Sequence, residues 1–258
     1  MAQVGNDESG LQIFGTQQSP IDISVDQTVP VMYGKHHIQY HYTGKLRGRY
    51  ESENFVFDEP GGNEASYTIT VAGKSWLLRK IHIHHKAEHT LNGGHPNDFE
   101  CHLLHSAPED LHALGDKLVI GVFFHLEAGA PKKEALHFLN KNLKDQASKA
   151  GGKTDCASLR GELDPREFLP PDDNARAAWF HYMGSLTTKP FSETVSWYVI
   201  HEEIPVDPGD IDQVQVHARQ HRRPTFPLNR RFVLRNVFDP NESPGKLAAR
   251  GRRKPKSA

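Results

Sequence analysis

Four histidines and a glutamate fall within the segment RKIHIHHKAEHT, residues 79–90. Side chains of these types at this density are typical of a metal site or of acid–base chemistry. In a strand, side chains alternate between faces, so His82 and His84 would point to the same side. In a helix, the pattern H-x-x-E-H from His85 to His89 would put two imidazoles one turn apart, as in an inverted zinc protease motif. The two conformations select different ligands.

The residues around these histidines favour the strand. The run KIHIH alternates polar and apolar residues and follows SWLLR with no residue that would cap a helix. The segment TLNGGHP then ends the run too soon for a helix of about three turns. A zinc ion with an open position for water needs three protein ligands, and ECHLLH (100–105) offers the third from a neighbouring antiparallel strand. The pattern therefore predicts a metal site of His82, His84 and a third histidine from ECHLLH, where His102 and His105 lie on opposite faces of the strand.

Strands are expected on both sides of this segment, and they must hold the site in place. The segment YTITVAGKSWLLRKIHIHH (67–85) predicts two strands around an Ala-Gly turn, because it is rich in β-branched and aromatic residues. Similar patterns predict strands over 99–105, 117–129, 194–206 and 230–236. An amphipathic helix is predicted over 132–149, with Gly151 as its stop signal. With no repeat or linker, the 258 residues are expected to form one mostly β domain.

Composition excludes several classes of protein. The net charge of −1 argues against nucleic acid as a partner. The longest apolar run, LVIGVFF (118–124), is far shorter than the ~20 residues that cross a membrane. Cys101 and Cys156 form neither a disulfide scaffold nor a C-x-x-C pair. These unpaired cysteines and the lack of a visible signal peptide favour the cytoplasm, or a periplasmic or secreted location if a signal has been removed.

Six segments taken together resemble the α-class carbonic anhydrases, in the family's order and at its approximate spacings. They are QSPIDI (18–23), HIHHKAEHT (82–90), ECHLLH (100–105), KLVIGVFF (117–124), LDPREFLPP (163–171) and GSLTTKPFSETVSW (184–197). The resemblance implies a single domain, mostly β with a few helices, around a twisted, largely antiparallel central sheet. It also implies a conical cleft that ends at zinc. On this basis residues 1–11 are expected to be an N-terminal extension, 12–240 the catalytic domain and 241–258 a basic, disordered tail.

The resemblance also implies a role for each site residue. His82, His84 and His102 match the Zn²⁺ ligands, and Glu100 matches a carboxylate that orients a ligand histidine. Thr187 and Glu88 match the catalytic pair that orients a zinc-bound hydroxide. The residues implied to bind carbon dioxide or bicarbonate are Leu104, Val119, Leu186, Thr188 and Trp197. The implied reaction is the reversible hydration of carbon dioxide to bicarbonate and a proton, by a water whose pKa is near 7, a value known from this family. Sulfonamide-type inhibitors are implied as further ligands, and the oligomeric state is left open.

Some positions depart from the family's pattern. Lys80 replaces a glutamine, Lys189 replaces the first of two prolines, and His85-Lys86 replaces a tryptophan and a glycine. Glu53, in YESENFVF, falls where fast members carry a histidine that relays protons. Because a carboxylate is a poor relay for a donor of pKa near 7, proton transfer is expected to limit turnover.

Two other functions compete with this prediction. A binding module of the same fold without catalysis would be expected to have lost ligands, whereas His82, His84 and His102 are all present. A zinc protease would use His85, Glu88 and His89, and it requires a helix at that point. A carbon dioxide hydration assay distinguishes the binding module from a carbonic anhydrase. Metal occupancy in histidine variants distinguishes the zinc protease from a carbonic anhydrase.

Overall fold

The structure is a computed structural model, and it describes residues 5–6, 12–13, 15–51, 53–57, 67–94, 97–106, 116–150, 156–219 and 222–238. The predicted tail 241–258 lies outside the described residues, as does most of the predicted extension 1–11. Two short strands, β1 (Gly5–Asn6) and β2 (Gln12–Ile13), pair antiparallel near the start of the chain. Among the described residues, no helix is long and apolar enough to cross a membrane.

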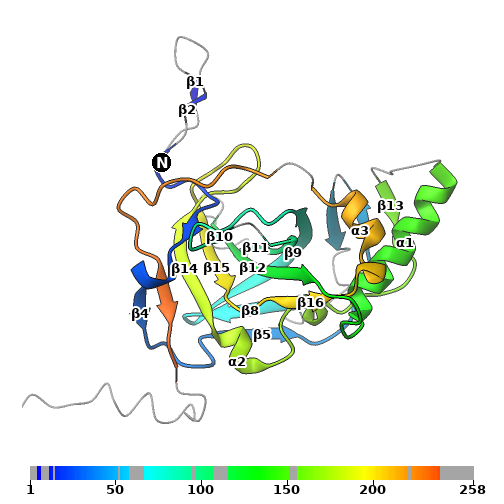
Figure 1. Cartoon of the computed structure of the whole chain (residues 1–258), viewed down its shortest axis with the longest axis horizontal. Helices are drawn as coiled ribbons and strands as arrows, with labels where there is room; N and C mark the ends of the chain where they lie inside the picture. Colours follow the sequence, from blue (N-terminus) through cyan, green and yellow to red (C-terminus); the bar gives the residue numbers. More distant parts are fainter. Residues whose placement is uncertain are drawn as a thin grey trace, which may run out of the picture.

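A large, twisted mixed sheet dominates the fold, and the described residues give it 13 strands (Figure 1). Its main path runs β13 (Cys156–Ser158), β6 (Gly48–Glu51), β7 (Asn54–Phe57), β9 (Lys74–His85), β11 (Phe99–Ser106), β12 (Lys117–Leu126), β15 (Val195–Ile200), β14 (Trp179–Gly184), β17 (Leu234–Asn236) and β4 (Val29–Val31). Beside this path, β8 (Tyr67–Val71) joins β9 to β5 (Ile38–Tyr42), and β16 (Ile204–Val206) pairs with β12. A separate parallel pair joins β3 (Asp22–Ile23) to β10 (Thr90–Leu91).

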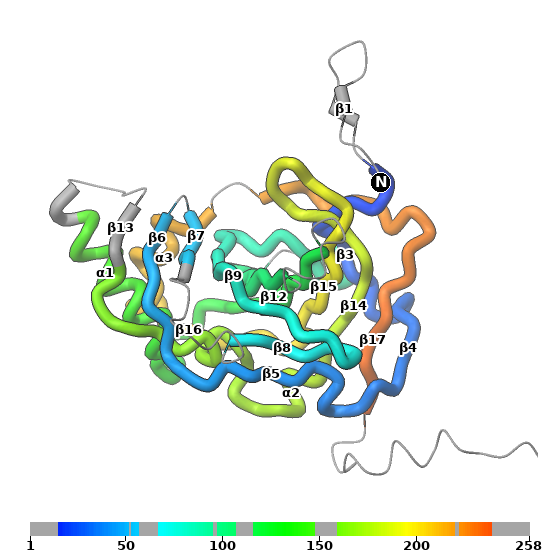
Figure 2. Tube along the Cα trace, turned by 180° about the vertical axis from the view of Figure 1, so that it is seen from behind, coloured from blue at the N-terminus to red at the C-terminus, as the bar shows by residue number. Residues whose placement is uncertain are grey.

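The sheet is largely antiparallel, as the sequence predicted. Parallel pairing occurs where β12 meets β15 and β16, and where β17 meets β4. The predicted hairpin of β8 and β9 is confirmed, with Ala72 (φ 50°) and Gly73 (φ 76°) in its turn. Positive φ at both central residues is what a two-residue type I′ turn requires. Figure 2, seen from behind, shows β6 at one end of the molecule and β4 and β17 at the other.

The described structure has few helices, and the longest of them lies at one end of the sheet. The predicted helix is observed as α1 (Glu134–Ala150), with α3 (Asp212–His217) packed beside it (Figure 1). The apolar stripe of α1 is buried, as the periodicity required: Ala135, Leu136, Leu139 and Leu143. A short helix, α2 (Asp173–Ala177), and three 3₁₀ turns, η1 (Val25–Gln27), η4 (Pro165–Phe168) and η5 (Pro208–Asp210), complete the described elements.

The central strands β11 and β12 are buried on both faces, and the two faces differ in what they contact. On β11, Cys101, Leu103 and His105 face the larger apolar core, which also includes residues of α1. The other face of β11 presents Glu100, His102 and Leu104 to a second, smaller cluster. This second face carries the residues that the sequence predicts to be functional.

Candidate metal centre

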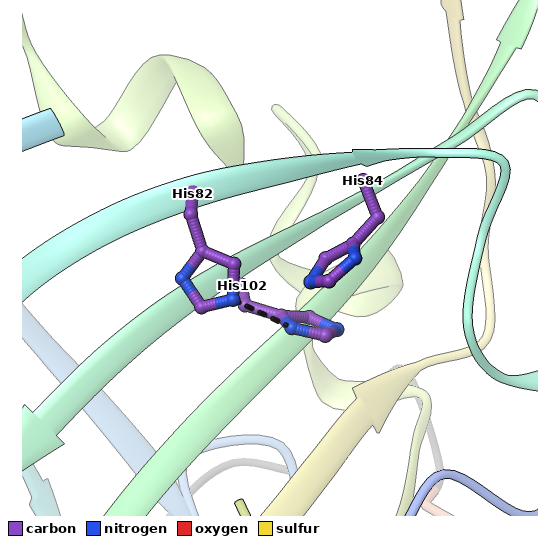
Figure 3. A group of neighbouring side chains, drawn as sticks. All are labelled: His82, His84 and His102. Atoms are coloured by element: carbon purple, nitrogen blue, oxygen red, sulfur yellow. Dashed lines mark hydrogen bonds between the residues drawn. The ribbon is translucent and has the colours of Figure 1, made fainter. Parts of the chain in front are cut away.

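The three predicted ligands meet because of how β9 and β11 are registered. His102 pairs directly with His82, and Glu100 pairs with His84. Directly opposed side chains on an antiparallel pair lie about 5 Å apart at Cβ, and alternation puts His84 on the same face as His82. Figure 3 shows the three imidazoles converging from the two strands. All three side chains are buried.

The ring nitrogens lie at distances that suit coordination of one ion. His102 Nδ1 lies 3.2 Å from His82 Nε2, the contact drawn as a dashed line in Figure 3. One nitrogen from each of the three histidines lies within 4.8 Å of the others. In a tetrahedral zinc site, two nitrogens about 2.0 Å from the metal are about 3.3 Å apart. Within the described chain, both ring nitrogens of His84 and Nδ1 of His82 have no hydrogen-bond partner.

The local electrostatics keep the imidazoles of His82 and His84 neutral, which a metal ligand requires. Burial lowers the pKa of His82 well below its ordinary value, and the positive charge of Arg219 lowers it further. Burial also lowers the pKa of His84 well below the ordinary value, with His102 as the next cause. The donor set therefore fits a divalent metal of zinc's kind.

Glu100 joins several of these groups through its buried carboxylate. Its Oε1 lies 2.9 Å from His102 Nε2 and 2.7 Å from His89 Nδ1, and its Oε2 accepts from the backbone N–H groups of Glu88 and His89. Burial by itself would raise the pKa of Glu100, but the adjacent His89 and His102 hold it well below the ordinary value. An ionised Glu100 beside Nε2 leaves Nδ1 of His102 directed at the other two histidines.

A second group of potential ligands is formed by His89, Glu100 and His102. His89 is already fixed at both ring nitrogens, by Glu100 and by the Tyr182 hydroxyl 2.7 Å from Nε2. Glu100 accepts backbone hydrogen bonds as well. This group therefore works as a hydrogen-bonded support for His102, and the open donor atoms belong to the first group.

Glu88 lies beside the histidines and is 1% exposed. Its Oε2 is 3.3 Å from His84 Nε2, and its Oε1 accepts from the backbone N–H of Arg223 at 3.1 Å. Burial raises the pKa of Glu88, and a side-chain hydrogen bond from Thr187 is among the contacts that lower it. Thr187 and Glu88 are thus brought together, although they are 99 positions apart in the chain.

A cavity of about 160 Å³ opens next to His82 and His102. Its walls include every residue that the sequence predicts to bind substrate: Leu104, Val119, Leu186, Thr188 and Trp197. Strand pairing explains part of this wall, because Leu104 lies opposite Val119 and Val119 lies opposite Trp197. The loop after β14 supplies the rest, and Trp197 Nε1 donates to the Ser185 carbonyl at its base.

Comparison with known proteins identifies the family. The family model for eukaryotic-type carbonic anhydrases matches residues 7–237. The chain belongs to this family. A carbonic anhydrase of Nostoc sp. is 31% identical over 169 residues, which cover 66% of this chain and 57% of that protein. Dioscorin DB3L of Dioscorea polystachya is 28% identical over 230 residues, covering 85% of this chain and 75% of that protein.

Solved structures of carbonic anhydrases share this fold. The α-carbonic anhydrase of Thermovibrio ammonificans, in complex with the inhibitor sulfanilamide, is 26% identical with a TM-score of 0.66. The match covers 85% of this chain and 87% of that one. A dioscorin complexed with ascorbate has a TM-score of 0.68 at 22% identity, covering 86% of each chain, and this similarity concerns the fold.

The carbonic anhydrase fold leaves the H-x-x-E-H pattern in a non-helical conformation. Strand β9 continues to His85, and residues 86–94 contain no helix. His85 lies near Gln215, with 3.3 Å between the two Nε2 atoms, and it belongs to neither potential metal group. The conformation that a zinc protease of this motif requires is therefore absent from residues 85–94.

Glu53, at the position where the resemblance places a proton relay, lies in a turn between two strands. The segment YESENFVF forms a hairpin of β6 and β7, with Tyr50 paired to Phe55, and Glu53 lies in its turn at φ 62°. The turn breaks the strand because only a few residues separate the two paired runs. Glu53 is not among the described residues that line the cavity.

The structure adds residues whose roles the sequence did not indicate. Arg223 contacts Glu88 through its backbone, and its guanidinium donates to Gln18 Oε1 and the Ser19 carbonyl. Tyr182 joins His89 to Ser19. The motif QSPIDI was a signal for Gln18 and Ser19, but no pattern in the sequence distinguished Arg223 or Tyr182 from ordinary residues.

Three lysines line the same cavity: Lys80, Lys117 and Lys189. Burial lowers the pKa of Lys80, and the nearby Arg219 and Lys117 lower it further. In the described part of the chain, no salt bridge involves any of these three residues. Compared with the glutamine and proline expected at two of these positions, the cavity gains positive charge.

Proposed function

We propose that this protein is a zinc-dependent carbonic anhydrase that hydrates carbon dioxide to bicarbonate and a proton, reversibly. One observation carries the proposal: three buried imidazoles converge, and two of them, His82 and His102, line a cavity of about 160 Å³ that also has apolar walls. Family membership supports the same reaction class. The combination suits a small apolar substrate that must meet a polar nucleophile.

The histidines would hold the metal through the ring nitrogens that face one another. A zinc ion bound by three neutral imidazoles supplies a water whose pKa is near 7, and therefore a nucleophile at neutral pH. Glu100 fixes the orientation and tautomer of His102 through its Nε2. His89 and the backbone N–H of Glu88 fix Glu100 in turn.

Thr187 and Glu88 orient the reacting water. Because Thr187 donates its hydroxyl proton to Glu88, the Thr187 oxygen is left to accept a hydrogen bond. A water that donates to Thr187 has a lone pair free to face the apolar wall. Leu104, Val119 and Trp197 hold carbon dioxide there and exclude competing water molecules.

A non-catalytic role is the second candidate. The similarity to a dioscorin, at 28% identity over 85% of the chain, is the reason to test whether this protein is a non-catalytic binding protein of the same fold. The complete ligand set and the Thr187–Glu88 contact favour catalysis. A hydration assay separates the two candidates directly.

The decisive experiment measures zinc content and hydration rate in matched histidine variants. The parent protein is expected to bind about one zinc per chain. His82→Ala should lose both the zinc and the activity, because a tetrahedral site loses one of its three protein ligands. The control, His85→Ala, removes an imidazole from the opposite face of β9 and should keep both.

Two results would contradict the proposal. Loss of zinc in His85→Ala with retention in His82→Ala would place the metal elsewhere. A parent protein that binds zinc without hydrating carbon dioxide would favour the binding role.

A further inference from the structure

The mouth of the cavity carries positive charge immediately beyond its apolar wall. Lys80 on β9 lies opposite Leu104, and Leu104 lies opposite Val119 on β12. Lys117 stands two residues before Val119 and therefore on the same face of β12. Lys189 approaches from the loop after β14, and all three lysines line the cavity. We call Lys80, Lys117 and Lys189 the lysine mouth.

These charges are not balanced by neighbouring carboxylates in the described structure. The residues that line the cavity include no aspartate or glutamate. Lys80 and Lys117 are close enough to repel each other, and Arg219 adds further positive charge beside Lys80. Like charges beside a low-dielectric wall raise the local potential and concentrate anions from solution. A bound anion would relieve this repulsion.

The proposed reaction also needs a proton acceptor, and the described cavity does not provide one. Its only histidines are His82 and His102, which the metal would occupy. Glu53, at the predicted relay position, lies in a hairpin turn and not in the cavity wall. An acceptor that arrives from solution fits the described lining of this cavity.

We propose that the lysine mouth binds an oxyanion of the phosphate class, and that this anion accepts the proton released by hydration. The inference rests on the proposed function. Carbon dioxide and water give bicarbonate and a proton, and hydrogenphosphate takes that proton to become dihydrogenphosphate. The second ionisation of a phosphate lies near neutral pH, which suits an acceptor for a donor near 7. Lysines hold the dianion more strongly than the monoanion, so protonation also promotes release.

The kinetic test compares phosphate with imidazole as the buffer, at constant pH and ionic strength, with rates measured by stopped flow. Phosphate should support half of its maximal rate at a lower concentration than imidazole does. Lys117→Gln and Lys189→Gln should each raise this phosphate concentration about fivefold, the effect of losing roughly 1 kcal/mol of charge interaction. The control, Lys141→Gln, removes an exposed lysine from α1 and should leave it unchanged.

Calorimetry with inorganic phosphate gives a second readout that does not depend on turnover. Binding should weaken about fivefold in the same two variants, both with zinc loaded and with zinc removed. Lysine-dependent binding without zinc would place the anion at the lysine mouth and not on the metal.

The outcomes separate the two proposals. No hydration in either buffer would contradict the proposed function itself. Hydration that responds equally to phosphate and imidazole, or phosphate binding that only inhibits, would overturn the role of the lysine mouth. Phosphate binding that is unchanged in both lysine variants would also overturn it.

Discussion

Two buried carboxylates, Glu88 and Glu100, lie within 4.0 Å of His102, and their pKa values are shifted in opposite directions. Burial raises the pKa of both, but His89 and His102 flank Glu100 closely enough to hold its pKa well below the ordinary value. His102, a hydrogen bond from Thr187 and the backbone of Arg223 lower the pKa of Glu88, but burial outweighs them and leaves it raised. Glu100, which has two imidazole nitrogens within 2.9 Å of its Oε1, is therefore the more firmly anionic carboxylate. We infer that Glu100 positions the ligand histidine His102, while Glu88 sets the direction of the hydrogen bond that Thr187 makes.

The hydrogen bond from Thr187 to Glu88 yields a prediction at the level of single residues. Thr187→Ala should keep its zinc but lose about two decades of hydration rate, the usual scale for one positioned partner in a transition state. Glu88→Gln should lose a similar amount, because an amide can donate to the Thr187 oxygen and reverse the bond. Zinc analysis and stopped-flow assays measure the two effects separately.

The control for this prediction is Thr187→Ser, which keeps the hydroxyl and should recover much of the rate. Near-normal activity in both Thr187→Ala and Glu88→Gln would show that another group orients the water.

At the level of elements, helices α1 and α3 fix the chain that runs beside the metal strand. Asn140 on α1 accepts from the backbone N–H groups of Gln213 and Val214 at the start of α3, at 2.6 and 3.1 Å. Beyond α3, Arg219 exchanges backbone hydrogen bonds with β9 through the Ile83 carbonyl and the His85 N–H. The helix pair therefore sets where Arg219 stands relative to the histidines.

The Asn140 contacts predict a loss of stability. Asn140→Ala should lower the free energy of unfolding by about 2 kcal/mol, since it removes the acceptor of the Val214 N–H and leaves the Gln213 N–H with Asp212 Oδ1 alone. Urea unfolding measures the change, and zinc content should stay the same. Lys141→Ala, at the next and exposed position of α1, should change stability by less than about 0.5 kcal/mol. Equal unfolding curves for Asn140→Ala and the parent would contradict this role.

At the level of the whole molecule, buried histidines make the fold sensitive to acid. His105 lies in the core on the opposite face of β11 from the metal centre, with Nε2 2.5 Å from the Tyr42 hydroxyl. Burial lowers the pKa of His105 to about 3. In the folded protein His105 therefore stays neutral at pH values where the same side chain is protonated in the unfolded chain, whose histidine pKa is about 6.5.

This difference predicts how stability depends on pH. Because the folded pKa lies below the unfolded value, stability is greatest above about pH 6.5 and falls as the pH drops toward 3. His105 alone should lower the unfolding free energy by about 2 kcal/mol between pH 7 and pH 5. In zinc-free protein, His105→Gln should reduce the pH-dependent loss by that amount, as measured by urea unfolding at both pH values. Parallel pH profiles for the two proteins would contradict the prediction.

The sequence by itself determined the parts of the site that follow local periodicity. Alternation in KIHIH placed His82 and His84 on one face, and a short connection to ECHLLH indicated that a histidine of that segment would join them across the ladder. The family resemblance implied that this histidine is His102, which lies opposite His82. The amphipathic helix and the β8–β9 hairpin followed from the same kind of pattern. Such features depend on neighbouring residues in the chain, so a single sequence expresses them directly.

Only the tertiary structure decided which distant residues complete the site. Arg223 reaches Glu88 across 135 positions, and Tyr182 reaches His89 across 93. The hairpin that takes Glu53 away from the cavity and the convergence of the lysine mouth depend in the same way on the packing of separate elements. These contacts are set by sheet order and strand register, which no local pattern encodes, because the residues involved become neighbours only when the whole sheet has formed.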